Sequence, residues 1–191
     1  MRAVVWPIAL SAIGAVTLAG WIAAQPDAER ASAGPVHVAA AGGGSLAWVL
    51  MGAVLITLRP RNVLGWLLLA LGTFAAWQVG LAAYGGYGVV VARPSWPGAD
   101  LAAAAGSVQF VPAVFATSTV VPAFYPNGRL VSRSWRRPVA AAGTAITLMI
   151  LAMPFAPDAW DEIAPGHAPP VSPPLAAPLP RRCPSPFLRT Y

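Results

Sequence analysis

The chain has 191 residues, of which 57% are hydrophobic and only 9% are charged. Soluble domains carry charge on about a quarter of their residues, so this composition excludes an ordinary soluble enzyme and indicates a membrane protein. The net charge of +6 does not indicate nucleic-acid binding, because the arginines stand between apolar runs, where positive charge sets the orientation of membrane segments.

The first apolar run covers residues 3–24 and follows Arg2. A positive start, an apolar stretch and small residues near Ala23 and Ala24 are compatible with a cleaved signal peptide. The run is nevertheless longer than the core of about 7–15 residues that signal peptides have, and long enough to cross a bilayer. We predict an uncleaved helix, with a cleaved signal peptide as the alternative.

The second and third helices are expected over residues 40–58 and 63–88, separated by an Arg-Pro-Arg-Asn sequence. The second begins among alanines and glycines that start a helix poorly in water. A bilayer forces the helical form, because the backbone finds no other hydrogen-bond partner there. In the third, Trp66 near the beginning and Tyr84 and Tyr87 near the end are typical of the headgroup level.

The fourth and fifth helices are expected over residues 101–125 and 139–155, with kinks at Pro112 and Pro122 in the fourth. Residues 157–191 hold ten prolines and are expected to form a disordered, Pro-rich C-terminal tail. The sequence therefore predicts an all-α, polytopic transmembrane bundle of about five helices within residues 1–156.

The arginines alternate between the predicted loops. The 59–62 loop carries two and the 126–138 loop carries four, whereas residues 25–37 hold two acids and one arginine and residues 92–100 one of each. By the positive-inside rule, the N-terminus lies in the cytoplasm and the tail outside the cell, in a multi-pass protein of the plasma membrane. The arginines of residues 129–137 have a second interpretation, contact with anionic lipids, beside this topological role.

The sequence predicts no catalytic, cofactor-binding or metal site. Cys183 is the only cysteine, His37 and His167 lie in separate loops, and no phosphate-binding loop or nucleophile elbow is present. No charged residue lies at the centre of a predicted helix, which argues against a pump or an ion-coupled transporter. Gln78 and Gln109 are polar residues within helices; hydrogen bonding between helices is the simpler interpretation and a ligand site the alternative.

Glycines at positions 65, 72 and 80 would let two helices approach closely. In a chain this rich in alanine and glycine, such spacing arises readily by chance. It therefore does not assign a dimer contact.

Two segments, RPRNVLGWLLLALG at 59–72 and FYPNGRLVSRSWRRPV at 124–139, are more specific than hydropathy alone. The first is similar to the loop and helix start, and the second to the Phe-Pro-(Asp/Asn)-Gly-Arg-Leu loop, of the N-terminal membrane region of actinobacterial sensor histidine kinases. The residues that carry the resemblance are Arg59, Arg61, Asn62, Gly65, Trp66, Pro126, Asn127, Gly128, Arg129, Leu130, Trp135 and Arg136.

The resemblance implies the sensory or anchoring input region of a two-component system. Within these 191 residues neither histidine stands in a dimerisation helix and no ATP-binding motif follows, so no enzymatic activity is expected. Its expected partners are membrane lipids and a histidine kinase or another membrane protein. A truncated kinase would account for this arrangement; a small structural or accessory membrane protein, or less favourably a transporter subunit, is the alternative.

Overall fold

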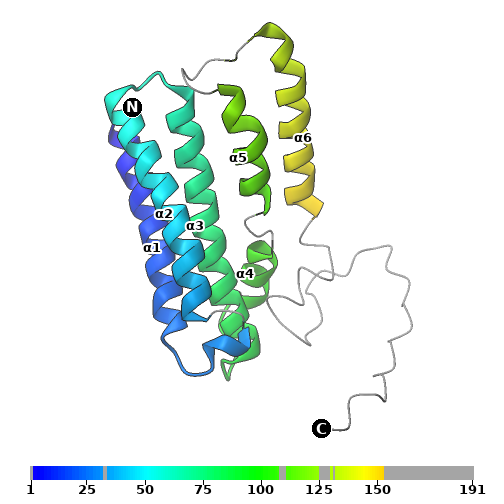
Figure 1. The fold of residues 1–191 in the computed structure, drawn as a ribbon. Helices are drawn as coiled ribbons and strands as arrows, with labels where there is room; N and C mark the ends of the chain where they lie inside the picture. The colour runs from blue at the N-terminus through cyan, green and yellow to red at the C-terminus, as the bar shows by residue number, and fades with distance from the viewer. Residues whose placement is uncertain (1, 32–33, 108–110, 125–129, 131, 153–191) are drawn as a thin grey trace, which may run out of the picture.

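The computed structural model describes residues 2–31, 34–107, 111–124, 130 and 132–152, and this part of the chain contains helices and no strand (Figure 1). The α-helices are α1 (Arg2–Ala23), α2 (Pro35–Leu58), α3 (Val63–Val90), α4 (Ala99–Gly106), α5 (Val111–Phe124) and α6 (Arg136–Ala152). Two short 3-10 helices, η1 (Ala28–Ala31) and η2 (Arg133–Trp135), precede α2 and α6. The predicted all-α class is confirmed for this part, while the predicted tail at 157–191 lies outside it.

Three of the helices are long and apolar enough to cross a membrane, over residues 4–23, 35–58 and 63–90. At 1.5 Å per residue, α2 and α3 are about 36 and 42 Å long, against about 30 Å of bilayer hydrocarbon. These lengths and compositions are compatible with the predicted membrane protein. They correspond to the first three of the five expected crossings.

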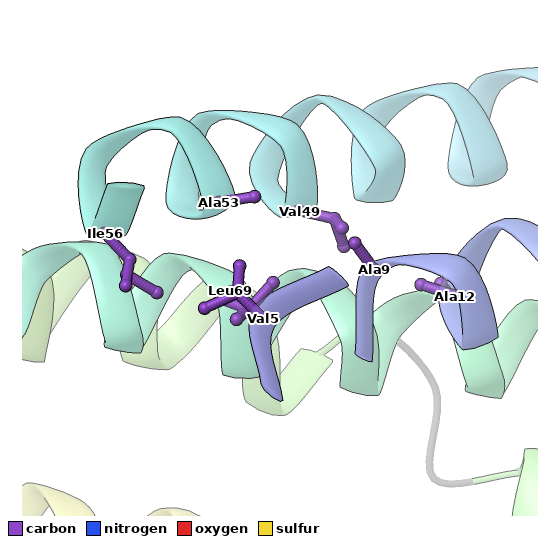
Figure 2. Close-up of a cluster of buried hydrophobic side chains, with 8 residues drawn as sticks. Val5, Ala9, Ala12, Val49, Ala53, Ile56 and Leu69 are labelled. Atoms are coloured by element: carbon purple, nitrogen blue, oxygen red, sulfur yellow. The ribbon is translucent and has the colours of Figure 1, made fainter. Parts of the chain in front are cut away.

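α3 is the central helix of the bundle, since α1, α2, α4 and α5 all contact it. Small and branched apolar side chains fill the space between α1, α2 and α3 (Figure 2). The residues buried in this core are Val5, Ala9, Ala12, Val49, Ala53, Ile56, Leu69 and Ala76. Because alanine is prominent among them, the helix axes come close together.

α2 and α3 approach each other closely at Gly72. A Cβ atom at this position would lie 2.6 Å from the Val49 backbone nitrogen and 2.9 Å from the Ser45 carbonyl oxygen. Carbon atoms in favourable contact are about 3.5–4.0 Å apart, so no larger residue fits here without moving a helix. Gly72, which the sequence left as a candidate for a contact between chains, is therefore used within one chain.

The second helix begins at Pro35, about one turn before the predicted start near residue 40. Proline suits the first helical position, because its missing N–H would have no partner there. Val38 is also buried between Ala19 and Ile22 of α1 and Ala83 of α3. Tertiary packing thus stabilises the first turn of α2, whose residues form a helix only weakly in isolation.

Two helices, α4 and α5, replace the single helix expected over 101–125. Ser107 ends α4: its N–H donates to the Ala103 carbonyl (2.9 Å) and its Oγ to the Ala104 carbonyl (2.7 Å). Residues 108–110, between α4 and α5, lie outside the described residues, and α5 is described from Val111 onward. Pro112 follows directly, and Pro122 lies inside α5.

The last described helix, α6, lies at the edge of the bundle, packed against α5 and η2 (Figure 1). It begins at Arg136, three residues before the predicted start, and none of its residues is buried. It is described as far as Ala152, the last described residue of the chain.

Candidate functional site

The first of the two family-like motifs, at residues 59–72, builds the tight turn between α2 and α3. The Arg59 N–H donates to the Leu55 carbonyl (2.7 Å), and the Asn62 N–H then donates to the Arg59 carbonyl (2.9 Å). The Asn62 side chain caps α3, because its Oδ1 accepts the Leu64 N–H at 3.0 Å. Asparagine is a favoured N-cap residue for this reason.

Gly65 and Trp66 hold this turn against the bundle. The Trp66 indole N–H donates to the Pro60 carbonyl at 3.2 Å, while its ring packs on the core. A Cβ atom at Gly65 would lie 3.0 Å from Cγ1 of Ile56, so glycine allows α3 to leave the turn close beside α2. The first motif therefore encodes a compact helix–turn–helix connection.

The second motif, at residues 124–139, lies only partly within the described residues. Pro126, Asn127, Gly128 and Arg129 lie outside the described residues. Leu130 is half-buried, and Trp135, which closes η2, is 45% exposed. Its N–H donates to the Ser132 carbonyl at 3.2 Å, and the exposed Arg136 follows as the first residue of α6.

The first motif and the described residues of the second lie at the same end of the bundle (Figure 1). We call it the arginine end, because in the described part of the chain it carries arginines and no carboxylate. Its arginines are Arg2, Arg59, Arg61, Arg133, Arg136 and Arg137. The antiparallel path of the helices thus brings residues far apart in the sequence to the same end of the bundle.

The opposite end carries the described carboxylates. Asp27, Glu29 and Asp100 lie there together with Arg30 and Arg93. Arg30 and Asp27 form an ion pair of 3.2 Å between two largely exposed side chains, and it is the one ion pair among the described residues. The positive charge of the arginine end therefore has no counter-charge in the described chain.

An aromatic cluster joins α1, α3 and the loop after α3 at this opposite end, which we call the aromatic end. The Trp96 ring centre lies 6.4 Å from that of Trp21, 5.2 Å from that of Tyr84 and 5.1 Å from that of Tyr87. Both tyrosine hydroxyls donate to loop carbonyls, Tyr84 to Pro97 (2.9 Å) and Tyr87 to Pro26 (3.3 Å).

Trp96 occupies the centre of this cluster and contacts the three other rings. An aromatic cage for a cationic ligand needs that central space to be open. The cluster is therefore a structural clamp that holds the loop against α1 and α3. The sequence pointed to Tyr84 and Tyr87 as interface residues but not to Trp96 as the centre of a cluster, because nothing in the local sequence marks the Trp96 side chain as turning inward.

Gln78, near the middle of α3, is 9% exposed, and its Oε1 accepts no hydrogen bond. The hydrogen bond between helices that we expected from this residue is therefore not made through Oε1. Thr73 Oγ1 is likewise buried and unpaired. Gln109, the other glutamine considered, lies outside the described residues.

Across the described residues, no three His, Cys, Asp or Glu side chains are grouped so that they could hold a metal ion. The arginine end and the motif residues described on it therefore remain as the candidate functional site. No protein-family model, no curated protein and no solved structure matches this chain.

Proposed function

We propose that the chain is a multi-pass plasma-membrane protein and acts as the sensory or anchoring input region of a two-component system. The observation that carries this proposal is that the described residues of both motifs lie at one end of the bundle, where the first motif builds a compact turn. Arg59, Asn62, Gly65 and Trp66 all take part in one compact turn, and the described residues of the second motif lie at the same end of the bundle. The residues that carry the resemblance in the first motif are therefore the ones that build this turn.

The proposed topology has five crossings. α1, α2 and α3 supply three, and α4 and α5 in succession lead from the aromatic end back to the arginine end (Figure 1). α6 then runs away from the arginine end and supplies the fifth. The positive-inside rule puts the arginine end in the cytoplasm.

The proposed mechanism is a change in helix packing that is passed across the bilayer. α1, α2 and α3 share one close-packed core, whereas α6 contacts α5 and η2 and buries none of its residues. A signal that shifts α5 and α6 against α3 would therefore leave the core intact and move Arg136 at the cytoplasmic surface. A histidine kinase in the same membrane is the proposed partner that would read this movement.

Reporter fusions test the topology. Alkaline phosphatase should be active when fused after Ala31 or after Tyr191, and inactive when fused after Arg61. A green fluorescent protein fused at the same points should give the reverse pattern. An inactive phosphatase at Tyr191 would contradict the five crossings, and an active one at Arg61 would contradict the orientation.

Co-purification tests the sensory role. The tagged chain should retain a co-expressed full-length actinobacterial kinase with a related membrane region, and it should not retain the same kinase with an unrelated membrane region. Equal retention of both, or of neither, would contradict the proposal and would favour an accessory membrane protein.

A further inference from the structure

We propose that the arginine end binds the headgroups of anionic phospholipids, with Arg136 and Arg137 at the start of α6 as the main contacts. This inference requires that the chain lies in a membrane. It does not depend on a partner kinase, so a failure of the sensory proposal would leave it standing.

The depth of the arginine end in a bilayer supports this assignment. The helices α2 and α3, about 36 and 42 Å long, both exceed the hydrocarbon thickness of about 30 Å, and α3 reaches the roughly 40–45 Å that includes the headgroups. Their shared turn, with Arg59 and Arg61, therefore lies among headgroups and not in the hydrocarbon. Trp66 and Trp135, amphipathic side chains suited to the interface, accompany the two groups of arginines.

The charge at this end calls for an external anion. Arg136 and Arg137 are exposed, and the first turn of α6 contains no acidic residue. Positive side chains near a helix N-terminus face the positive end of the helix dipole, which is unfavourable unless an anion lies close by. The described carboxylates are all at the aromatic end, at the far end of helices about 36 and 42 Å long, so none of them can neutralise this charge.

The chemistry of arginine selects the phosphodiester of a lipid as that anion. A guanidinium group donates two parallel hydrogen bonds to a phosphate, which fixes the headgroup as well as attracting it. Zwitterionic lipids carry a phosphate too, but their own cation offsets the attraction. Each arginine near an anionic surface raises the affinity about fivefold, so the pair on α6 should produce a clear preference for anionic over zwitterionic lipid.

Spin-labelled lipids test this preference in purified protein. The full chain is reconstituted in phosphatidylcholine vesicles that contain a trace of spin-labelled phosphatidylglycerol or spin-labelled phosphatidylcholine, and the protein-bound fraction is measured by electron paramagnetic resonance. The wild type should prefer phosphatidylglycerol. R136Q/R137Q should reduce that preference about fivefold or more. The matched control R30Q/R93Q removes two arginines from the aromatic end and should leave the preference unchanged.

Because the protein is already in the bilayer, its insertion topology does not enter this measurement. R136K/R137K keeps both charges and should retain most of the preference; a loss as large as that of the glutamine variant would overturn the proposal. Equal effects of R136Q/R137Q and R30Q/R93Q would also overturn it, since overall charge would then be the cause. So would a wild type without preference, or displacement of the lipid by millimolar inorganic phosphate, which would indicate a site for the free ion.

Discussion

The contact at Gly72 leads to the sharpest prediction about stability. In Gly72→Ala the new Cβ atom would lie 2.6 Å from the Val49 nitrogen and 2.9 Å from both the Ser45 carbonyl oxygen and the Trp48 Cβ. Restoring an ordinary contact of about 3.5 Å requires α2 and α3 to move apart by about 1 Å. Two of the three atoms belong to the backbone, so a side-chain rotation cannot relieve the overlap.

The expected cost follows from that displacement. Overpacking of a close-packed interior costs about 1–3 kcal/mol, and we expect Gly72→Ala to lower the free energy of unfolding by that amount. The matched control is Gly44→Ala on the outer face of α2, where a Cβ atom would meet nothing within 4 Å. This control should be neutral or should stabilise by up to about 1 kcal/mol, because alanine favours the helix over glycine.

Reversible unfolding in mixed micelles, followed by far-ultraviolet circular dichroism, measures both variants under the same conditions. The wild type and Gly44→Ala should unfold at similar denaturant fractions and Gly72→Ala at a lower one. Equal midpoints for the two variants would refute the reasoning, since they would mean that α2 and α3 do not meet at Gly72 as closely as the structure shows.

Three other substitutions test separate contacts in the same unfolding assay. Asn62→Ala removes the cap on α3 and should cost about 1 kcal/mol, whereas Asn62→Ser should restore most of it; equal losses would argue against the cap. Tyr84→Phe removes the hydrogen bond to Pro97 and should cost about 0.5–1.5 kcal/mol with little change in the near-ultraviolet spectrum of the tryptophans. Gln78→Leu replaces a buried, unpaired carbonyl oxygen and should be neutral or stabilising; a loss above about 1 kcal/mol would show that the amide is bonded after all.

The helix boundaries that could be predicted are those with a local signal. α3 begins at Val63 as expected, because Asn62 is a capping residue directly after a polar turn and before a long apolar run. The start of α2 was predicted too late, because its stability comes from Val38 packing against α1 and α3. The end of α4 at Ser107 was missed because hydropathy alone treats residues 101–125 as one apolar run, whereas the Ser107 hydroxyl donates back to the Ala104 carbonyl.

The candidate site was predictable as a set of residues but not as a surface. The motif residues could be identified from their order along the chain. What each side chain does is seen only from its contacts in the folded structure. Asn62 caps the helix, and Trp66 reaches back to the Pro60 carbonyl. Arg136 lies at the same end of the bundle as both (Figure 1).

The sequence by itself determined the composition, the helical class and the spacing of the arginines, because hydrophobicity and charge are properties of each residue alone. Only the tertiary structure decided that α3 lies at the centre, that Gly72 is used within the chain and that Trp96 clamps the aromatic end. These features depend on which helix faces meet. In a chain rich in alanine and other apolar residues, many helix faces look alike, and close packing alone selects among them.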